Sequence, residues 1–260
     1  PLGPRESTMS SFLDRIRPAK ENEVEALLNS PPAPIQRTIR SLAGALRTPG
    51  LSAIAEIKRR SPSRGDIRPG ADPVEIALAY QAAGAAGISV LTDGPHFGGS
   101  LKDLEHVSAA VNIPVLRKDF LIHKVQLDEA HAHGADAALL MVSMLKPTQL
   151  KHMLRHAHEL GLECLVEAHS ADEVKVAIDC GAIVLGVNNR DLRSLNIDLA
   201  VCEALIPTLP DTVVAVAESG VHNRADALRM EKSGAMAILV GTGLMTQDDP
   251  GAALSALLGR

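Results

Sequence analysis

The sequence predicts an α/β protein, a closed (β/α)8 barrel with an N-terminal helical extension. Short aliphatic runs alternate with longer amphipathic stretches, which is typical of parallel βαβ units. Eight such units occupy about 210 of the 260 residues, the usual size of a closed barrel. Aromatic residues make up only 2% of the chain, so we expect an aliphatic core of helices packed over a buried parallel sheet. A doubly wound open sheet is the alternative, but the glycine fingerprint that normally follows its first strand does not follow Lys58.

The segment before the first barrel strand is expected to contain two helices. Residues 1–8 (PLGPREST) look like a remnant of an expression vector, and residues 9–260 are expected to form one barrel domain with residues 10–47 as its extension. Ser10 can cap a first helix, a proline-rich stretch ends it, and residues 35–46 are interpreted as a second helical segment. We expect the extension to plug one end of the barrel; covering the substrate is the alternative role.

Each barrel unit joins one aliphatic run to one amphipathic stretch. The expected strands are residues 51–58, 88–92, 114–118, 136–142, 162–167, 182–188, 212–218 and 236–241. The expected helices are residues 72–84, 100–110, 124–134, 147–161, 170–181, 198–206, 223–234 and 250–258. Asp72 and Asp249 each precede a proline, which places a capping acid before a first-turn proline.

Composition and charge restrict the partners of the chain. The formal net charge of −5 provides no basic field for nucleic acid or an anionic membrane, so an anionic ligand must be bound locally. No apolar run approaches the roughly 18 residues of a membrane-spanning helix. Three cysteines without a CxxC pair indicate reduced thiols and a cytoplasmic protein. His152, His156 and His158 share one helix without an HExxH pattern, so we expect a solvated helix face and no metal site.

Charged and polar side chains end several of the predicted strands. Active sites of such barrels lie at the carboxyl ends of the strands, and the alternation of the first strand points Glu56 and Lys58 toward the same opening. The other strand-end residues expected there are Lys118, Glu167, Asn188 and Glu218. A purely structural ion-pair network is the alternative, but aliphatic replacements of such networks are often neutral or stabilising. Close Lys and Glu groups also shift each other's pKa values toward those that proton transfer needs.

The loops after these strands suggest a phosphate site and an apolar wall. Ser61 lies in a basic loop after the first strand, Ser219-Gly220 follows the seventh, and Gly241-Thr242 follows the eighth, the loops in which barrels frequently bind phosphate. Phe97 and Phe120 stand in strand-end loops of a chain that has few rings, which favours a wall for a flat ligand group. Ordinary packing under a loop is the alternative for each ring.

A set of motifs occurs in order and covers almost everything from residue 50 onward. They are AEIKRRSPSRG (55–65), ISVLTDGPHFGGS (88–100), PVLRKDF (114–120), GADAALL (134–140), LVEAHS (165–170), GVNNRDL (186–192), VAESGV (216–221) and ILVGTGLM (238–245). With them the chain resembles the indole-3-glycerol-phosphate synthase family of tryptophan biosynthesis, and the segment FLDRI resembles the start of that family's N-terminal extension. The resemblance implies a TIM barrel and a lyase.

The resemblance also implies a reaction and its residues. The lyase would close the ring of 1-(2-carboxyphenylamino)-1-deoxyribulose 5-phosphate with loss of carbon dioxide and water, without cofactor or metal. Lys118 would be the general acid, Glu167 the general base with Glu56 assisting, and Lys58 would bind the carboxylate and act in dehydration. The residues implied to position the substrate are Asn188, Arg190 and Glu218. Those implied to hold the phosphate are Ser61, Ser219, Gly220, Gly241 and Thr242, and those implied to line the ring pocket are Phe97, Phe120, Leu139 and Leu239. The expected partner is a small phosphorylated substrate, and the expected state is a monomer or weak homo-oligomer.

Two positions depart from the family pattern. His96 stands where many members have a second aromatic residue, which puts the packing of the ring wall in question, and Thr242 replaces a frequent serine with the same hydroxyl group. A sugar-phosphate isomerase on the same barrel is a rival function, but it would need a Cys/Asp pair at the opening, and the cysteines are expected elsewhere. A ligand-binding barrel without catalysis would not need the pair Lys118 and Glu167.

Overall fold

Eight parallel strands close into a barrel in the computed structural model, which describes residues 12–33, 35–191 and 194–260. The strands are β1 (Ser52–Ile57), β4 (Gly87–Leu91), β5 (Val115–Lys118), β6 (Ala137–Met141), β7 (Glu163–Ala168), β8 (Val184–Asn188), β9 (Val214–Glu218) and β10 (Ala237–Val240). Each strand pairs with its neighbours in sequence, and β10 pairs with β1 to complete the ring. The predicted (β/α)8 TIM barrel is therefore confirmed.

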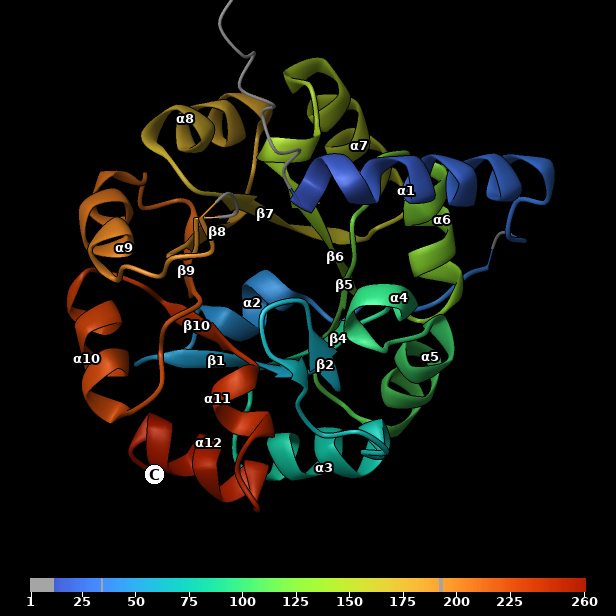
Figure 1. Cartoon of the computed structure of the whole chain (residues 1–260). Coiled ribbons are helices and arrows are strands. Elements are labelled where there is room, and N and C mark those ends of the chain that lie inside the picture. The colour runs from blue at the N-terminus through green and yellow to red at the C-terminus, as the bar shows by residue number, and fades with distance from the viewer. Residues whose placement is uncertain (1–11, 34, 192–193) are drawn as a thin grey trace, which may run out of the picture.

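A ring of helices surrounds the strands (Figure 1). These helices are α3 (Pro73–Ala82), α5 (Leu101–Ala110), α6 (Val125–Ala132), α7 (Pro147–Glu159), α8 (Ala171–Cys180), α9 (Ala200–Leu205), α10 (Arg224–Lys232) and α12 (Pro250–Leu258). The carboxylate of Asp72 accepts a hydrogen bond from the backbone of Val74, and that of Asp249 accepts one from Ala252. The predicted caps therefore do start α3 and α12.

Shorter elements fill the loops at the carboxyl ends of the strands. They are the hairpin of β2 (Arg60–Ser61) and β3 (Gly65–Asp66), and the single turns α4 (Gly94–Phe97), η1 (Val142–Met144) and α11 (Thr242–Met245). A further single turn, η2 (Ile206–Thr208), follows α9 and leads into the start of β9. Every residue of β1, β4, β6, β8, β9 and β10 is buried, as expected for parallel strands with the barrel interior on one side and helices on the other.

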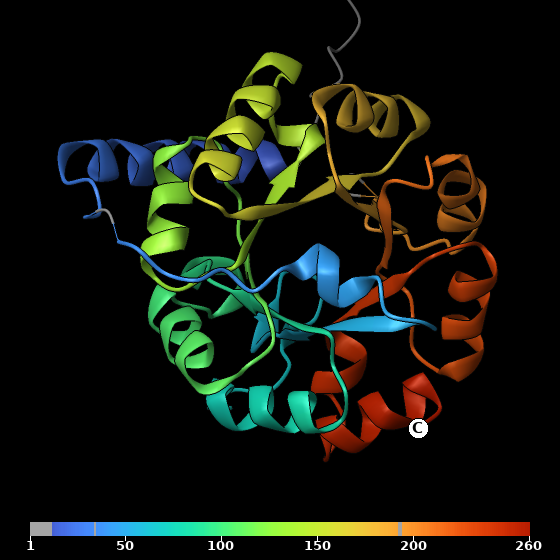
Figure 2. The ribbon, with the colours of Figure 1, turned by 180° about the vertical axis from the view of Figure 1, so that it is seen from behind.

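The residues before the barrel contact both of its ends. Helix α1 (Phe12–Asn29) lies along the outside near α6, while α2 (Leu42–Leu46) lies across the amino-terminal opening, as the rear view shows (Figure 2). Leu42 and Leu46 are fully buried there. The proposed cap Ser10 and residues 1–8 lie outside the described residues. Within the described ranges, no helix is both long and apolar enough to span a bilayer.

The prediction of one helix over residues 35–46 is wrong in its first part, because only Leu42–Leu46 is helical. The preceding residues are extended along the barrel, where the guanidinium groups of Arg37 and Arg40 reach the buried carboxylate of Asp136 at 2.8 and 2.7 Å. The backbone N–H of Arg40 also donates to Asp136. Contacts far along the chain therefore outweigh the local helical pattern.

Candidate active site

A cavity of about 260 Å³ lies at the carboxyl ends of the barrel strands. The predicted residues that line it are Glu56, Lys58, Ser61, Phe97, Lys118, Phe120, Leu139, Glu167, Asn188, Arg190, Ser219 and Thr242. Four other predicted residues, Glu218, Gly220, Leu239 and Gly241, stand outside this lining. Glu218 reaches the cavity through its contact with Lys118, and an added side chain at Gly241 would approach Glu56 to 2.4 Å.

A larger groove of about 890 Å³ lies at the opposite end, near the first residues of β7 and β8 and between α7 and α8. It contains none of the predicted site residues. It does contain Cys164 and Cys180, whereas Cys202 is buried against the backbone of Val187. No cysteine therefore lines the carboxyl-end cavity, so the Cys/Asp pair of the isomerase alternative is not formed by these residues.

The centre of the cavity is an ion cluster of two ammonium groups and three carboxylates. The Nζ of Lys118 is 3.1 Å from Glu218, 3.4 Å from Glu56 and 4.0 Å from Glu167. The Nζ of Lys58 is 2.7 Å from the second oxygen of Glu56. The three carboxylates are each about 5% exposed or less, so they interact in a medium of low dielectric. Glutamates outnumber lysines in this cluster, so Lys118 is shared among three carboxylates.

The pKa values follow from this imbalance. Burial favours the neutral form of every group, but Lys58 and Lys118 outweigh it at Glu56 and lower the pKa of that carboxyl group. Burial also opposes the charge on Lys118, yet Glu218, Glu56 and Glu167 together raise its pKa above the ordinary value. At Glu218, burial and the neighbouring Glu167 prevail and raise the pKa to about 7. Lys118 therefore stays protonated as an ammonium group, and Glu218 is the acid that titrates near neutrality.

The geometry around Glu218 agrees with this titration. Its Oε1 is buried without a hydrogen-bond partner among the described residues, and only Oε2 contacts Lys118. The neighbouring strand β8 leaves room for this carboxyl group at Gly186, where an added Cβ would lie 2.0 Å from Oε1. The glycine in the motif GVNNRDL therefore accommodates a side chain of the ion cluster.

Glu167 is held by one side-chain hydrogen bond as well as by charge. The side-chain amide of Asn188 donates to its Oε1 at 3.0 Å, and the carbonyl oxygen of Asn188 accepts from the backbone of Arg190 at 3.0 Å. Burial raises the pKa of Glu167, but His169 and Lys118 outweigh burial and lower it to about 2. Glu167 is thus an ionised carboxylate in contact with the cavity.

An aromatic wall stands beside the charges. The ring centroids of Phe97 and Phe120 are 6.0 Å apart, and Phe12 from α1 packs edge-on against Phe120 at 6.0 Å and against His96 at 5.5 Å. Phe97 and Phe120 were predicted from the sequence, but Phe12 was not, because nothing local in a helix before the barrel indicates contact with loops about a hundred residues later. Leu13 of the same helix also lines the cavity and was missed for the same reason. Met141 at the end of β6 and Leu195 after β8 line the cavity as well and were not predicted.

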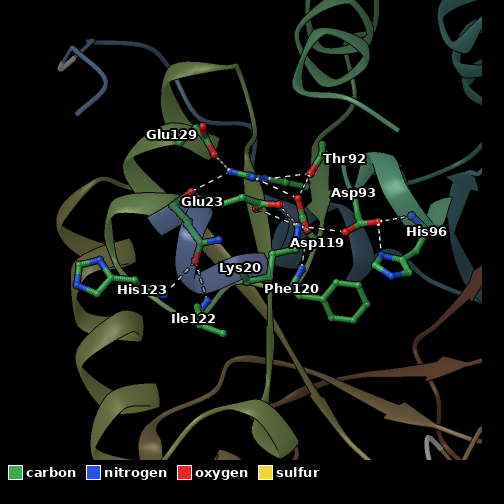
Figure 3. Close-up of polar contacts among 12 residues, drawn as sticks. Lys20, Glu23, Thr92, Asp93, His96, Asp119, Phe120, Ile122, His123 and Glu129 are labelled. Atoms are coloured by element: carbon green, nitrogen blue, oxygen red, sulfur yellow. Dashed lines mark hydrogen bonds and ion pairs between the residues drawn. The ribbon is translucent and has the colours of Figure 1, made fainter. Parts of the chain in front are cut away.

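Buried ion pairs beneath this wall connect it to α1 (Figure 3). Lys20 is 2% exposed, and its Nζ lies 2.8 Å from Asp119 and 3.1 Å from Asp93. Asp119 accepts from the backbone of Phe120, and Asp93 accepts from the backbone of His96. Burial raises the pKa of Asp119, but Arg117 and Lys20 outweigh burial and lower it to about 2. One lysine of α1 thus joins the two loops that carry the rings.

Hydroxyl groups and strained backbone lie at the predicted phosphate site. Ser61, Ser63, Ser219 and Thr242 all line the cavity. Ser219 has a φ of 62° and Gly220 a φ of 83°. Left-handed backbone costs a residue with a side chain roughly 1–2 kcal/mol, and such strain is concentrated at functional sites.

Comparison with known proteins shows the family of this chain. A family model described as indole-3-glycerol phosphate synthase matches residues 13–257. Curated proteins of that name are similar: one from Mycolicibacterium gilvum is 46% identical over 91% of this chain and 85% of its own length, and one from Mycobacteroides abscessus is 45% identical over 97% and 94%. Among solved structures, a thiamine phosphate pyrophosphorylase from Pyrococcus furiosus shares the fold with a TM-score of 0.60 at 18% identity, covering 84% of this chain and 96% of that one. The match over nearly the whole chain, together with the ion cluster at the barrel opening, means that the chain belongs to the indole-3-glycerol phosphate synthase family of tryptophan biosynthesis enzymes.

Proposed function

We propose that this cavity closes the indole ring of 1-(2-carboxyphenylamino)-1-deoxyribulose 5-phosphate, with release of carbon dioxide and water, and so forms indole-3-glycerol phosphate. The observation that carries the proposal is the position of Lys118, an ammonium group held among three buried glutamates in a ring-lined cavity. Membership in the family supports the same reaction.

Lys118 acts as the general acid of ring closure. The aromatic carbon that bears the carboxylate attacks the ketone carbon, a carbon–carbon bond forms, and the ketone oxygen takes a proton from Nζ. Departure of carbon dioxide then returns the electron pair of the broken bond to the ring. Glu218, whose pKa is raised to about 7, lies 3.1 Å from Nζ, within reach to return a proton to the lysine, and the ionised Glu56 lies 3.4 Å from the same atom.

Glu167 acts as the general base of the dehydration that follows. The new hydroxyl group leaves as water with one added proton, and a base removes one proton from the neighbouring carbon bound to nitrogen, which forms the indole double bond. Glu56 assists this transfer, and Lys58, 2.7 Å from Glu56, binds the substrate carboxylate and takes part in the loss of water. No electrons enter or leave in these steps, so the reaction as written requires no redox cofactor.

Binding at both ends of the substrate gives the reaction its geometry. The phosphate is held by Ser61, Ser219, Gly220, Gly241 and Thr242. The ring is enclosed by Phe97, Phe120, Leu139 and Leu239. The part of the substrate between the phosphate and the ring is oriented by Asn188, Arg190 and Glu218. Anchoring the phosphate and the carboxylate restricts the motion of the ring to the approach that forms the bond, which is orientation catalysis.

Incubation of the purified protein with the carboxyphenylamino ribulose phosphate tests the reaction, because the indole product is fluorescent. We expect product from the wild type and a fall in kcat of at least about 100-fold in Lys118→Ala, the range of general acid catalysis. Lys175→Ala is the matched control, since this exposed lysine pairs with the exposed Asp179. Circular dichroism checks that both variants fold. Full activity of Lys118→Ala would exclude its proposed role, and absence of indole product from the wild type would exclude the reaction.

A further inference from the structure

Glu167 has a neighbour that its proposed role does not use. The Nε2 of His169 lies 3.2 Å from Oε1 of Glu167. The Nδ1 of the same ring lies 3.1 Å from the carboxylate of Glu173, which also accepts from the backbone N–H of His169 at 2.7 Å. Carboxylate, imidazole and carboxylate therefore form a chain that begins at the cavity wall and ends on α8.

Local structure at the end of β7 produces this arrangement. Alternation along the strand places Glu167 and His169 on the same side, with Ala168 between them on the other. Ser170 then caps α8, accepting from the backbone of Glu173, and this first helical turn directs Glu173 back toward His169. The side chains become more exposed along the chain, from 3% at Glu167 through 14% at His169 to 26% at Glu173.

The charges fix the protonation of the ring. Burial lowers the pKa of His169, but Glu167 and Glu173 outweigh burial and raise it to about 10. The imidazole is thus a cation at neutral pH: its Nδ1 hydrogen-bonds to Glu173, and its Nε2 forms an ion pair with Glu167. The pKa of Glu173 is lowered although burial opposes this, because His169 donates to it.

The two oxygens of Glu167 consequently have different neighbours. His169 and the amide of Asn188 both contact Oε1, whereas the closest ammonium contact, that of Lys118 at 4.0 Å, is with Oε2. With Oε1 occupied from two directions, the rotation of the carboxylate is restricted and Oε2 is the oxygen that remains to meet substrate.

We propose that His169 is the positioning residue of Glu167: anchored by Glu173, it orients the carboxylate by binding Oε1 and leaves Oε2 to accept the proton. This inference rests on the proposed function for the role of Glu167 as base. The contacts with His169 are nevertheless a property of the free protein. They can be measured without substrate.

Kinetics of His169→Ala test the role. We expect kcat to fall about 10-fold or more while KM changes little, because a misdirected base stabilises the transition state less but does not alter the binding of substrate. Loss of the imidazolium also raises the pKa of Glu167, although Lys118 still faces it and Glu218 remains nearby. Because the base works only when ionised, the acidic limb of the kcat profile must move to higher pH. His169→Gln keeps a neutral donor, so kcat should recover above that limb while the limb stays displaced.

A matched control and a second readout separate this inference from the reaction itself. His156 is a histidine of similar exposure that pairs with Asp128 at 2.8 Å on the barrel exterior, so His156→Ala should leave kcat and the pH profile unchanged. In the free protein, NMR of labelled glutamate carboxyl carbons should show Glu167 titrating at higher pH in His169→Ala. An unchanged titration together with unchanged kcat would overturn the inference. A wild type that makes no indole product would overturn the proposed function and leave the titration result standing.

Discussion

At the scale of single residues, the site is a group of acids and bases whose numbers do not balance. Three glutamates share two lysines, and the carboxylate with the weakest compensation is Glu218, whose Oε1 has no partner among the described residues. Gly186 makes room for that oxygen. A protein whose stability alone were selected would gain little from this arrangement, because buried ion clusters are often no better than apolar packing.

The raised pKa of Glu218 has a consequence for stability that can be measured. Its folded value of about 7 exceeds the ordinary 4.5, so the folded state keeps a proton that the unfolded state has already lost. The contribution of Glu218 to the free energy of unfolding must therefore decrease as pH rises from about 4.5 to about 7. Glu218→Gln cannot lose this proton, and the decrease should shrink by on the order of 3 kcal/mol. Urea unfolding at pH 5 and pH 8 measures this change in the free energy of unfolding. An equal change with pH in the variant and the wild type would contradict the assignment.

At the scale of elements, the sequence predicted what local rules determine. The parity of a strand places Glu56 and Lys58 on one face, and the common direction of parallel strands brings Lys118, Glu167 and Glu218 to the same opening. No local rule indicates that a ring and a lysine from α1 complete the wall. The predicted helix over residues 35–46 failed for the same reason, since its arginines bind a carboxylate about a hundred residues away.

Helix α1 therefore should influence substrate binding through Lys20. Lys20→Met removes the cation that joins the loops of His96 and Phe120, and we expect KM to rise several-fold with a smaller effect on kcat, because the wall binds substrate and transition state alike. The buried aspartates left behind should also cost about 3–5 kcal/mol of stability. Lys20→Arg should restore much of both quantities.

A second variant keeps this prediction independent of folding. Phe12→Leu removes the edge-on contacts with Phe120 and His96 without creating an unpaired charge. Its KM should rise as well, while its free energy of unfolding should change by less than that of Lys20→Met. Steady-state kinetics and urea unfolding measure the two effects, and unchanged KM in both variants would contradict a role of α1 in substrate binding.

At the scale of the whole molecule, the N-terminal extension lines the cavity at one end of the barrel and covers the opening at the other. Its first turn lines the carboxyl-end cavity with Phe12 and Leu13, and its last turn, α2, covers the amino end with Leu42 and Leu46. Residues at the two ends of a closed barrel can be substituted with separate effects, because the chemistry is confined to one end. Stability and activity should therefore respond independently to substitutions at the amino end.

Asp136 provides the test of this independence. It is fully buried at the start of β6, pairs with Arg37 and Arg40, and accepts from the backbone of Val115, far from the catalytic opening. Asp136→Ala leaves two guanidinium groups without their partner, and we expect a loss of about 3 kcal/mol in the free energy of unfolding. Asp179→Ala removes an exposed, solvent-screened ion pair with Lys175 and should lower the free energy of unfolding much less than Asp136→Ala. Urea unfolding compares the two variants, and KM should stay at the wild-type value in both. A changed KM in Asp136→Ala would mean that the amino-end contacts of the extension also set the geometry of the catalytic opening.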